Sequence, residues 1–144
     1  MVFKEIKNLC NGPYKNEAEF KAALIKQFAK IYPNVTIFQI ENEEKEPGMP
    51  DILFCSNHSP SVWTEVKISD KNGRIEFQPS QPLWYKKHHQ TQNIQILAWD
   101  VRFKRVVAMY PEDIVSLKKT SFQLPGENDI TLFVDAHVLR SSDE

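Results

Sequence analysis

The spacing of hydrophobic residues predicts one amphipathic helix near the N-terminus. Apolar side chains recur there at intervals of four, four and three residues: Phe20, Leu24, Phe28 and Ile31. That spacing places them on one face of a helix over residues 16–32. Asn16 is the expected N-cap, and Glu19 follows three residues later in capping-box position.

Runs of β-branched and aromatic residues predict extended segments along the rest of the chain. The expected strands cover residues 35–40, 52–55, 62–68, 93–99, 102–109 and 130–134, with a brief extended stretch at 74–77. Within residues 62–68 neighbouring side chains alternate between the two faces, so Glu65 and Lys67 project together and Val66 projects to the other side.

Two further helices are expected at residues 80–91 and 111–119. The resulting order, αβββαββαβ, predicts an α/β protein whose central mixed β-sheet is flanked by helices. A chain of 144 residues suits a single domain. We expect that domain to span residues 1–144, with its core at about residues 16–110 and a C-terminal extension over residues 111–144.

Composition narrows the class of protein without identifying it. Hydrophobic residues make up 41% of the chain and charged residues 26%, which is ordinary for a globular domain. The chain has no apolar run long enough to span a membrane and no secretory signal, so a cytoplasmic location is expected. Cys10 and Cys55 are far apart and lack metal-ligand spacing, so both are expected to be free thiols.

The near-neutral net charge of -1 conceals a basic segment. Residues 86–119 contain seven Lys and Arg against three Asp and Glu, a net of +4. Cations can neutralise the phosphates of a DNA backbone, although solvated protein surfaces often carry similar charge. The candidates for contacts with DNA are Lys86, Lys87, His88, Arg102, Lys104 and Arg105.

Three charged residues stand where two expected strands can meet. Asp51 precedes the strand at 52–55, and Glu65 and Lys67 share one face of the next strand. If the two strands form a hairpin, Asp51 approaches Glu65, and two adjacent carboxylates attract a cation. Oxygen ligands without thiolates favour Mg²⁺ or Mn²⁺. An amine beside such a pair can orient a water molecule or neutralise a phosphate, although an exposed ion pair would have the same sequence.

Three motifs around these residues resemble the PD-(D/E)XK nuclease superfamily. They are Gly48-Met49-Pro50-Asp51, Glu65-Val66-Lys67 and a downstream glutamine in Ser80-Gln81-Pro82-Leu83-Trp84. The pattern is most similar to the VRR-NUC branch and its phage-encoded relatives, and more distantly to Holliday-junction resolvases and restriction enzymes. The resemblance covers about residues 16–88, and it implies a restriction-endonuclease-like fold.

The resemblance also implies a role for each matching residue. Asp51, Glu65 and the backbone carbonyl of Val66 would bind the metal, and Lys67 would be the catalytic lysine. The first-helix glutamate of the family falls on Glu17, with Glu19 as the alternative. The motif glutamine falls on Gln81, where it would orient Lys67 or a phosphate, and Gln78 is a weaker candidate.

The expected activity is therefore Mg²⁺-dependent hydrolysis of DNA phosphodiester bonds, with Mn²⁺ as a substitute. We expect an endonuclease that prefers junctions or branched DNA and acts as a homodimer, since one small domain reaches one scissile strand at a time. A nucleotide cofactor is not expected, because the chain has neither a Walker A motif nor GxGxxG. The alternatives are a non-catalytic nucleic-acid-binding module and a virion-assembly protein on the same fold.

Overall fold

A seven-stranded mixed sheet forms the centre of the protein, and a two-stranded sheet accompanies it. The computed structural model describes residues 4–6, 9–40, 45–57, 60–117, 120–128 and 131–133. The elements in chain order are β1 (Lys4–Ile6), α1 (Glu17–Ile31), β2 (Thr36–Gln39), β3 (Ile52–Cys55), β4 (Val62–Ile68), β5 (Arg74–Glu76), α2 (Ser80–His88), β6 (Asn93–Asp100), β7 (Arg105–Met109), α3 (Pro111–Leu117), β8 (Ser121–Gln123) and β9 (Thr131–Phe133). The chain is thus an α/β protein, as its sequence predicts.

The order of strands in the large sheet is β2-β3-β4-β6-β7-β1-β9. β4 and β6 run parallel, because β5 and α2 return the chain to the edge of the sheet where β4 began. β1 and β9 are also parallel, and the remaining neighbours in this sheet are antiparallel. The small sheet pairs β5 with β8.

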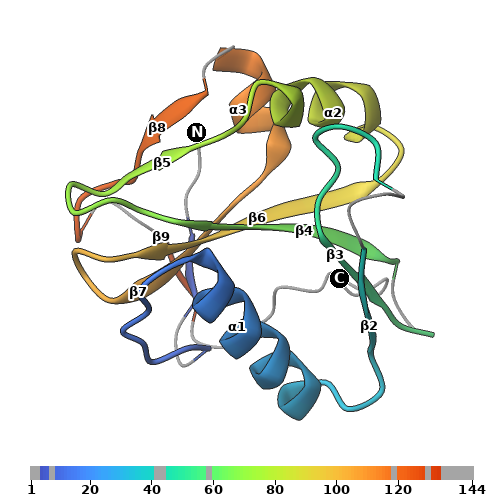
Figure 1. Ribbon diagram of the computed structural model, residues 1–144, viewed down its shortest axis with the longest axis horizontal. Coiled ribbons are helices and arrows are strands. Elements are labelled where there is room, and N and C mark those ends of the chain that lie inside the picture. The colour runs from blue at the N-terminus through green and yellow to red at the C-terminus, as the bar shows by residue number, and fades with distance from the viewer. Residues whose placement is uncertain are drawn as a thin grey trace.

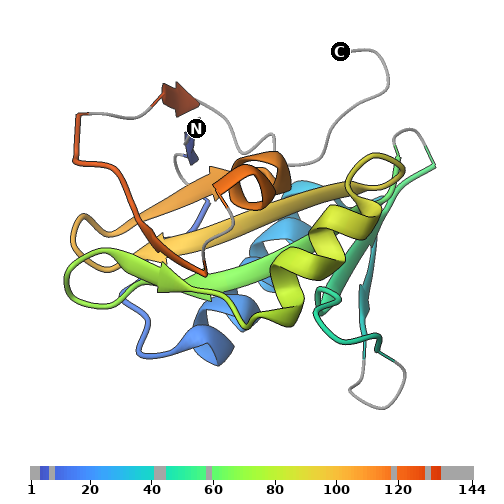
Figure 2. The same ribbon diagram turned by 90° about the horizontal axis from the view of Figure 1, so that it is seen from above.

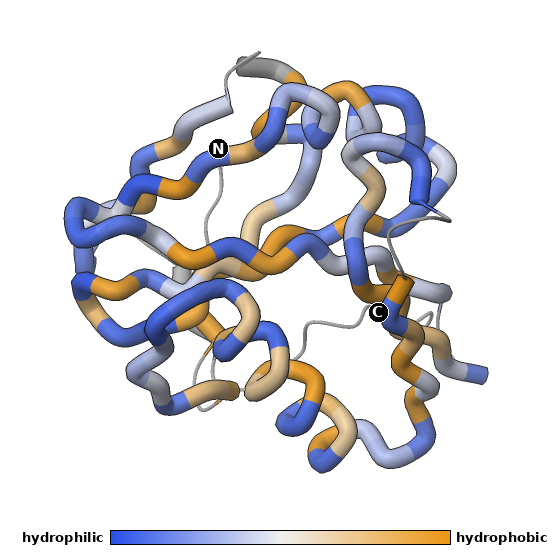
Figure 3. Tube along the Cα trace, in the orientation of Figure 1, coloured by the Kyte–Doolittle hydropathy of each residue, from blue (hydrophilic) through white to orange (hydrophobic). Residues whose placement is uncertain are grey.

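Helices cover both faces of the large sheet (Figure 1). α1 lies on one side of β4 and β6, while α2 and α3 lie on the other. The view from above shows α2 and α3 in front of the strands (Figure 2). Hydrophobic and polar positions alternate along Glu65–Ile68 of β4 (Figure 3). β6 and β7 instead carry continuous apolar runs, Ile96–Trp99 and Val106–Met109, which supply hydrophobic side chains to both layers.

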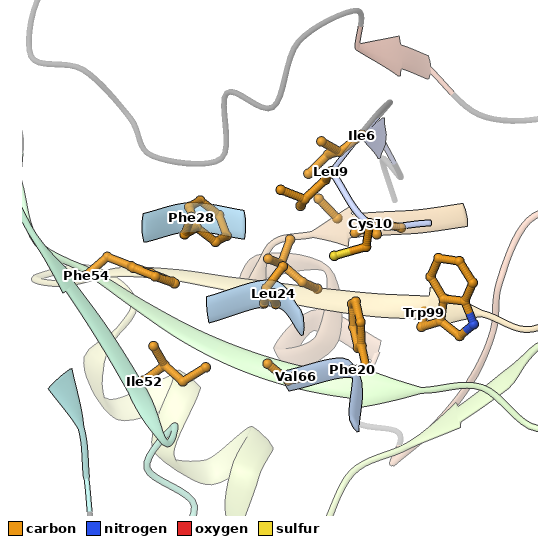
Figure 4. Close-up of a cluster of buried hydrophobic side chains, with 13 residues drawn as sticks. Ile6, Leu9, Cys10, Phe20, Leu24, Phe28, Ile52, Phe54, Val66 and Trp99 are labelled. Atoms are coloured by element: carbon orange, nitrogen blue, oxygen red, sulfur yellow. The ribbon is translucent and has the colours of Figure 1, made fainter. Parts of the chain in front are cut away.

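The core under α1 confirms most of the predicted helical stripe. Phe20, Leu24 and Phe28 are fully buried, and they pack against the sheet and against Trp99 of β6 (Figure 4). Asn16 caps the helix by accepting a hydrogen bond of 2.9 Å from the backbone N–H of Glu19. Ile31 was expected on the same face, but it is 41% exposed because α1 ends there, beyond the edge of the packed core.

The opposite core lies between the sheet and α2, α3 and the small sheet. Its buried members are Ile75, Phe77, Trp84, Tyr85, Ile94, Ile96, Ala98, Val107, Met109, Ile114, Phe122 and Leu124. Trp63 of β4 packs against this cluster, whereas Val66 belongs to the core under α1. Because side chains alternate along β4, Glu65 and Lys67 share the face that carries Trp63.

The sequence predicts the long elements better than the short ones. The strands at residues 52–55 and 62–68 have the expected bounds, and both cysteines are free thiols. The predicted order omits β1, β5 and β8, each of three residues, although an extended stretch was expected near β5. In the described part of the chain, no helix is both long and apolar enough to cross a membrane.

Candidate active site

Asp51 and Glu65 lie opposite each other where β3 and β4 begin to pair. Ile52 of β3 is in register with Thr64 of β4, and continuing this antiparallel register by one residue places Asp51 opposite Glu65. The backbone carbonyl of Asp51 accepts a hydrogen bond of 2.8 Å from the N–H of Ile40, which continues the pairing of β2 and β3. Directly opposite residues have Cβ atoms about 5 Å apart and project to the same side. The two carboxylates therefore share one face of the sheet.

Glu65 is a buried acid without a direct partner. It is 7% exposed, and among the described residues its carboxylate forms no hydrogen bond or ion pair. The pKa of Glu65 is raised to about 7, because burial and the charge of Asp51 together outweigh the lowering effect of the Lys67 charge. Such a carboxylate is poised to gain a cation, because a cation would offset the cost of its burial.

Lys67 is held in place by two groups on the α2 side of the sheet. Its Nζ donates a hydrogen bond of 2.9 Å to Oε1 of Gln81, and it lies 4.9 Å from the centre of the Phe77 ring. The same Oε1 accepts a second hydrogen bond, of 2.8 Å, from the backbone N–H of Gln78. The structure thus brings Gln81 to Lys67, while Gln78 contributes its backbone rather than its side chain.

Asp51 is neutralised by two lysines, Lys21 and Lys45, neither of which belongs to the sequence motifs of the site. Nζ of Lys21 on α1 lies 3.4 Å from Oδ2, and Nζ of Lys45 donates to Oδ1. Partial burial raises the pKa of Asp51, but the hydrogen bond from Lys45 and the charges of both lysines outweigh it and lower the pKa overall. Lys21 follows Glu17 by four residues and shares its side of the helix, which is a signal that sequence could have provided. Lys45 carries no such signal.

Gly48 fixes the segment before Asp51 against the first turn of α2. Its φ is +86°, and an added Cβ would lie 2.0 Å from the backbone oxygen of Ser80. The side chain of Trp84 donates a hydrogen bond of 3.1 Å to Glu46, which ties the same segment to α2. Close packing of this segment against the backbone of α2 therefore requires glycine at position 48, since a larger residue would not fit.

Tyr85 of α2 is a further residue close to the site. It is fully buried, and its hydroxyl has no hydrogen-bond partner among the described residues. Burial raises the pKa of this phenol, and the negative charges of Glu65 and Asp51 raise it further. Tyr85 follows Gln81 by four residues on α2, so both project from one face of the helix.

The two glutamates considered on α1 have different surroundings. Glu17, on which the family's first-helix glutamate falls, is the first residue of α1 and is exposed. Its charge nevertheless contributes to the raised pKa of Glu65. Glu19 accepts a hydrogen bond of 2.9 Å from the backbone N–H of Lys15 and so belongs to the cap of the helix. This difference favours Glu17 as the acid nearer the site.

The donors at the site fit a hard divalent cation with few protein ligands. In the part of the chain that the structure describes, no group of three or more His, Cys, Asp and Glu side chains is arranged to hold a metal. Mg²⁺ needs only one or two carboxylates, because water and phosphate oxygens complete its coordination. Asp51 and Glu65 meet that requirement, and the carbonyl of Val66 is the expected backbone ligand.

The cations expected to contact DNA are divided between two ends of β6. Lys86 and Lys87 are exposed at the end of α2, just before β6 begins, and Lys104 is exposed in the turn that follows β6. The eight residues of β6 separate these ends by about 26 Å. His88 packs against Trp84, with ring centres 4.3 Å apart, and its Nε2 lies 3.5 Å from Glu46. It therefore does not extend the exposed basic surface.

Arg102 and Arg105 neutralise a buried carboxylate instead of forming a basic rim. Asp100 is fully buried, and Arg102 Nη2 and Arg105 Nη2 lie 3.1 and 3.0 Å from its Oδ2. Both guanidinium groups also donate to the backbone oxygen of Pro125. The side chain of Arg105 is only 3% exposed, so its placement does not support the expected contact with DNA.

Comparisons with known proteins do not assign this chain to a family. No protein-family model matches the chain, and no curated protein matches it either.

Proposed function

We propose that this protein is a metal-dependent deoxyribonuclease of the PD-(D/E)XK type with a restriction-endonuclease-like fold. The observation that carries the proposal is the convergence of Asp51, Glu65, Lys67 and Gln81 on one side of the sheet. These residues come from the turn before β3, from β4 and from α2, so their proximity is not a consequence of neighbouring positions in the chain.

Each of these residues has a chemical task in phosphodiester hydrolysis. Asp51 and Glu65 would hold Mg²⁺, together with the carbonyl of Val66 and with Glu17 acting from the edge of the site. The bound ion polarises the phosphate and lowers the pKa of a water molecule. Lys67 orients the attacking water or neutralises negative charge that develops on the phosphate, and Gln81 holds its ammonium group in position.

The proposed substrate is DNA, with Lys86 and Lys87 as the exposed cations that contact its backbone. These contacts carry no sequence information, so we propose a preference for junctions or branched DNA over a particular sequence. A homodimer would allow paired cuts in two strands. Mn²⁺ is expected to replace Mg²⁺, because both prefer oxygen ligands.

The test is cleavage of supercoiled plasmid and of a labelled four-way junction, each with Mg²⁺ and with chelator. We expect the unmodified protein to cut with Mg²⁺ and not with chelator, and Lys67→Ala to lose at least 100-fold in rate. Lys71→Ala is the matched control, since Lys71 is exposed in the turn after β4 and remote from Asp51.

The other outcomes separate the rival functions. Equal cleavage by Lys67→Ala and the unmodified protein would overturn the site assignment. Salt-dependent binding to the junction without cleavage would indicate a non-catalytic nucleic-acid-binding module. Absence of both binding and cleavage would favour an assembly protein.

A further inference from the structure

Both carboxylate oxygens of Asp51 are occupied by ammonium groups in this structure. Lys45 donates to Oδ1, and Lys21 lies 3.4 Å from Oδ2. The lysines approach from separate elements, since Lys21 is on α1 and Lys45 is on the segment between β2 and β3. The side chain of Lys45 is 18% exposed and that of Asp51 is 41% exposed, so this contact lies at the solvent-accessible side of the site, with the ammonium group as the more buried partner.

A divalent cation that binds Asp51 competes with both ammonium groups for the carboxylate oxygens. Mg²⁺ binds carboxylate oxygen at about 2.1 Å and tolerates little distortion of its octahedral geometry. An ammonium group on the same oxygen would then lie within a few ångströms of the ion, and like charges at that distance repel strongly. We therefore expect binding of the ion to displace Lys45 and to weaken the contact of Lys21.

We propose that Lys45 and Lys21 are exchangeable counterions of Asp51. They neutralise the carboxylate while no metal is bound, and they transfer to a DNA phosphate when a divalent cation takes their place. This inference rests on the proposed function, and it adds two residues and a regulatory step to the same site. The exchange keeps the negative charge of Asp51 compensated in both states, so the acid is never left partly buried and unpaired.

The transfer to phosphate follows from the geometry of the displaced groups. The scissile phosphate is expected beside the ion, because phosphate oxygens complete the coordination of Mg²⁺ at such sites. Lysine has three donors on a flexible four-carbon stem, so its ammonium group can shift by a few ångströms while its backbone stays fixed. Lys45 and Lys21 would thus already stand next to the phosphate that replaces Asp51 as their partner.

The experiment measures metal binding and DNA binding separately, without relying on cleavage. Isothermal titration with Mn²⁺ alone gives the dissociation constant for Lys45→Met, Lys21→Met and the charge-conserving Lys45→Arg. Lys26→Met is the matched control, since Lys26 is exposed on α1 and away from Asp51. Fluorescence anisotropy with a labelled four-way junction in Ca²⁺ then gives DNA affinity. Thermal unfolding confirms that each variant is folded.

We expect Lys45→Met to bind Mn²⁺ about three- to tenfold more tightly, because a competing positive charge is removed. The same variant should bind the junction about three- to tenfold more weakly in Ca²⁺, since a phosphate contact is lost. Lys21→Met should change both affinities in the same directions by a smaller factor, and Lys45→Arg and Lys26→Met should match the unmodified protein in Mn²⁺ affinity.

Several results would overturn the exchange. Unchanged Mn²⁺ affinity in Lys45→Met would show that the lysine does not compete with the ion. Tighter Mn²⁺ binding with unchanged junction affinity would show that the lysine does not transfer to phosphate. Failure of the unmodified protein to bind Mn²⁺ would overturn the metal-dependent function itself, and the exchange with it. Asp51→Asn, which should abolish the Mn²⁺ signal, distinguishes binding at this site from binding elsewhere.

Discussion

The ammonium group of Lys67 donates a hydrogen bond of 2.9 Å to the side-chain carbonyl of Gln81. This bond joins β4 to the first turn of α2, and Lys67 is otherwise surrounded by buried groups, including the ring of Phe77. An ammonium group at such a depth needs an acceptor. The position of the proposed catalytic lysine is therefore set by an amide on another element.

Loss of that acceptor should impair cleavage without abolishing it. Gln81→Ala removes the bond to Lys67, and we expect the rate of plasmid cleavage to fall by about 10- to 100-fold with little change in junction binding. Gln78→Ala is the matched control, because Gln78 contributes only its backbone N–H. A Gln81→Ala protein that cuts as fast as the control would contradict the positioning role.

The raised pKa of Glu65 predicts how the metal-free protein responds to pH. The folded pKa is about 7 and the ordinary value is 4.5, so between these values the folded state holds a proton that the unfolded state has released. The stability from this group is fully present below pH 4.5 and is lost as the pH rises through 7. The loss is on the order of 3 kcal/mol.

Glu65→Gln should remove this dependence, since an amide stays neutral. With chelator present, urea unfolding at pH 5 and pH 8 should show a smaller loss of stability in the variant than in the unmodified protein. Glu76→Gln is the control, because Glu76 is exposed on β5 and should leave the dependence intact. The same pH profile in Glu65→Gln and the unmodified protein would mean that another group titrates.

The exposed cations of α2 should determine the salt dependence of DNA binding. Replacing both Lys86 and Lys87 by alanine is expected to reduce the slope of log affinity against log salt by up to about two. Lys26 and Lys30, on the exposed surface of α1, provide the double control. An unchanged slope in the α2 variant would place the DNA on another surface.

Arg105 should contribute to stability and not to DNA affinity. Arg105→Ala leaves the buried carboxylate of Asp100 with one of its two ion-pair partners, and we expect a loss of about 3 kcal/mol in the free energy of unfolding. The salt slope of junction binding should stay constant at a temperature where the variant is folded. If Arg105→Ala reduced the salt slope of junction binding while its free energy of unfolding stayed normal, Arg105 would contact DNA after all.

Local periodicity determined the parts of this protein that the sequence predicts well. The intervals between Phe20, Leu24 and Phe28 predict the buried face of α1, and alternation along residues 62–68 places Glu65 beside Lys67. Asp51 was expected near Glu65 from the hairpin alone, and the register of β3 and β4 places it there. Each of these inferences depends on spacing within one element or between two consecutive strands, which the chain itself encodes.

Contacts between segments that are distant in the sequence determined the other features of the site and the fold. Lys45 and Tyr85 reach the site only because the segment around Gly48 packs on α2 and α2 packs on the sheet. Arg105 belongs to a basic run in the sequence, but folding pairs it with Asp100 and buries it. β1 and β8 are three residues long, too short for a periodic signal, so their pairing partners define them. These contacts depend on which surfaces pack together in the folded chain, and the local spacing of residues does not determine that.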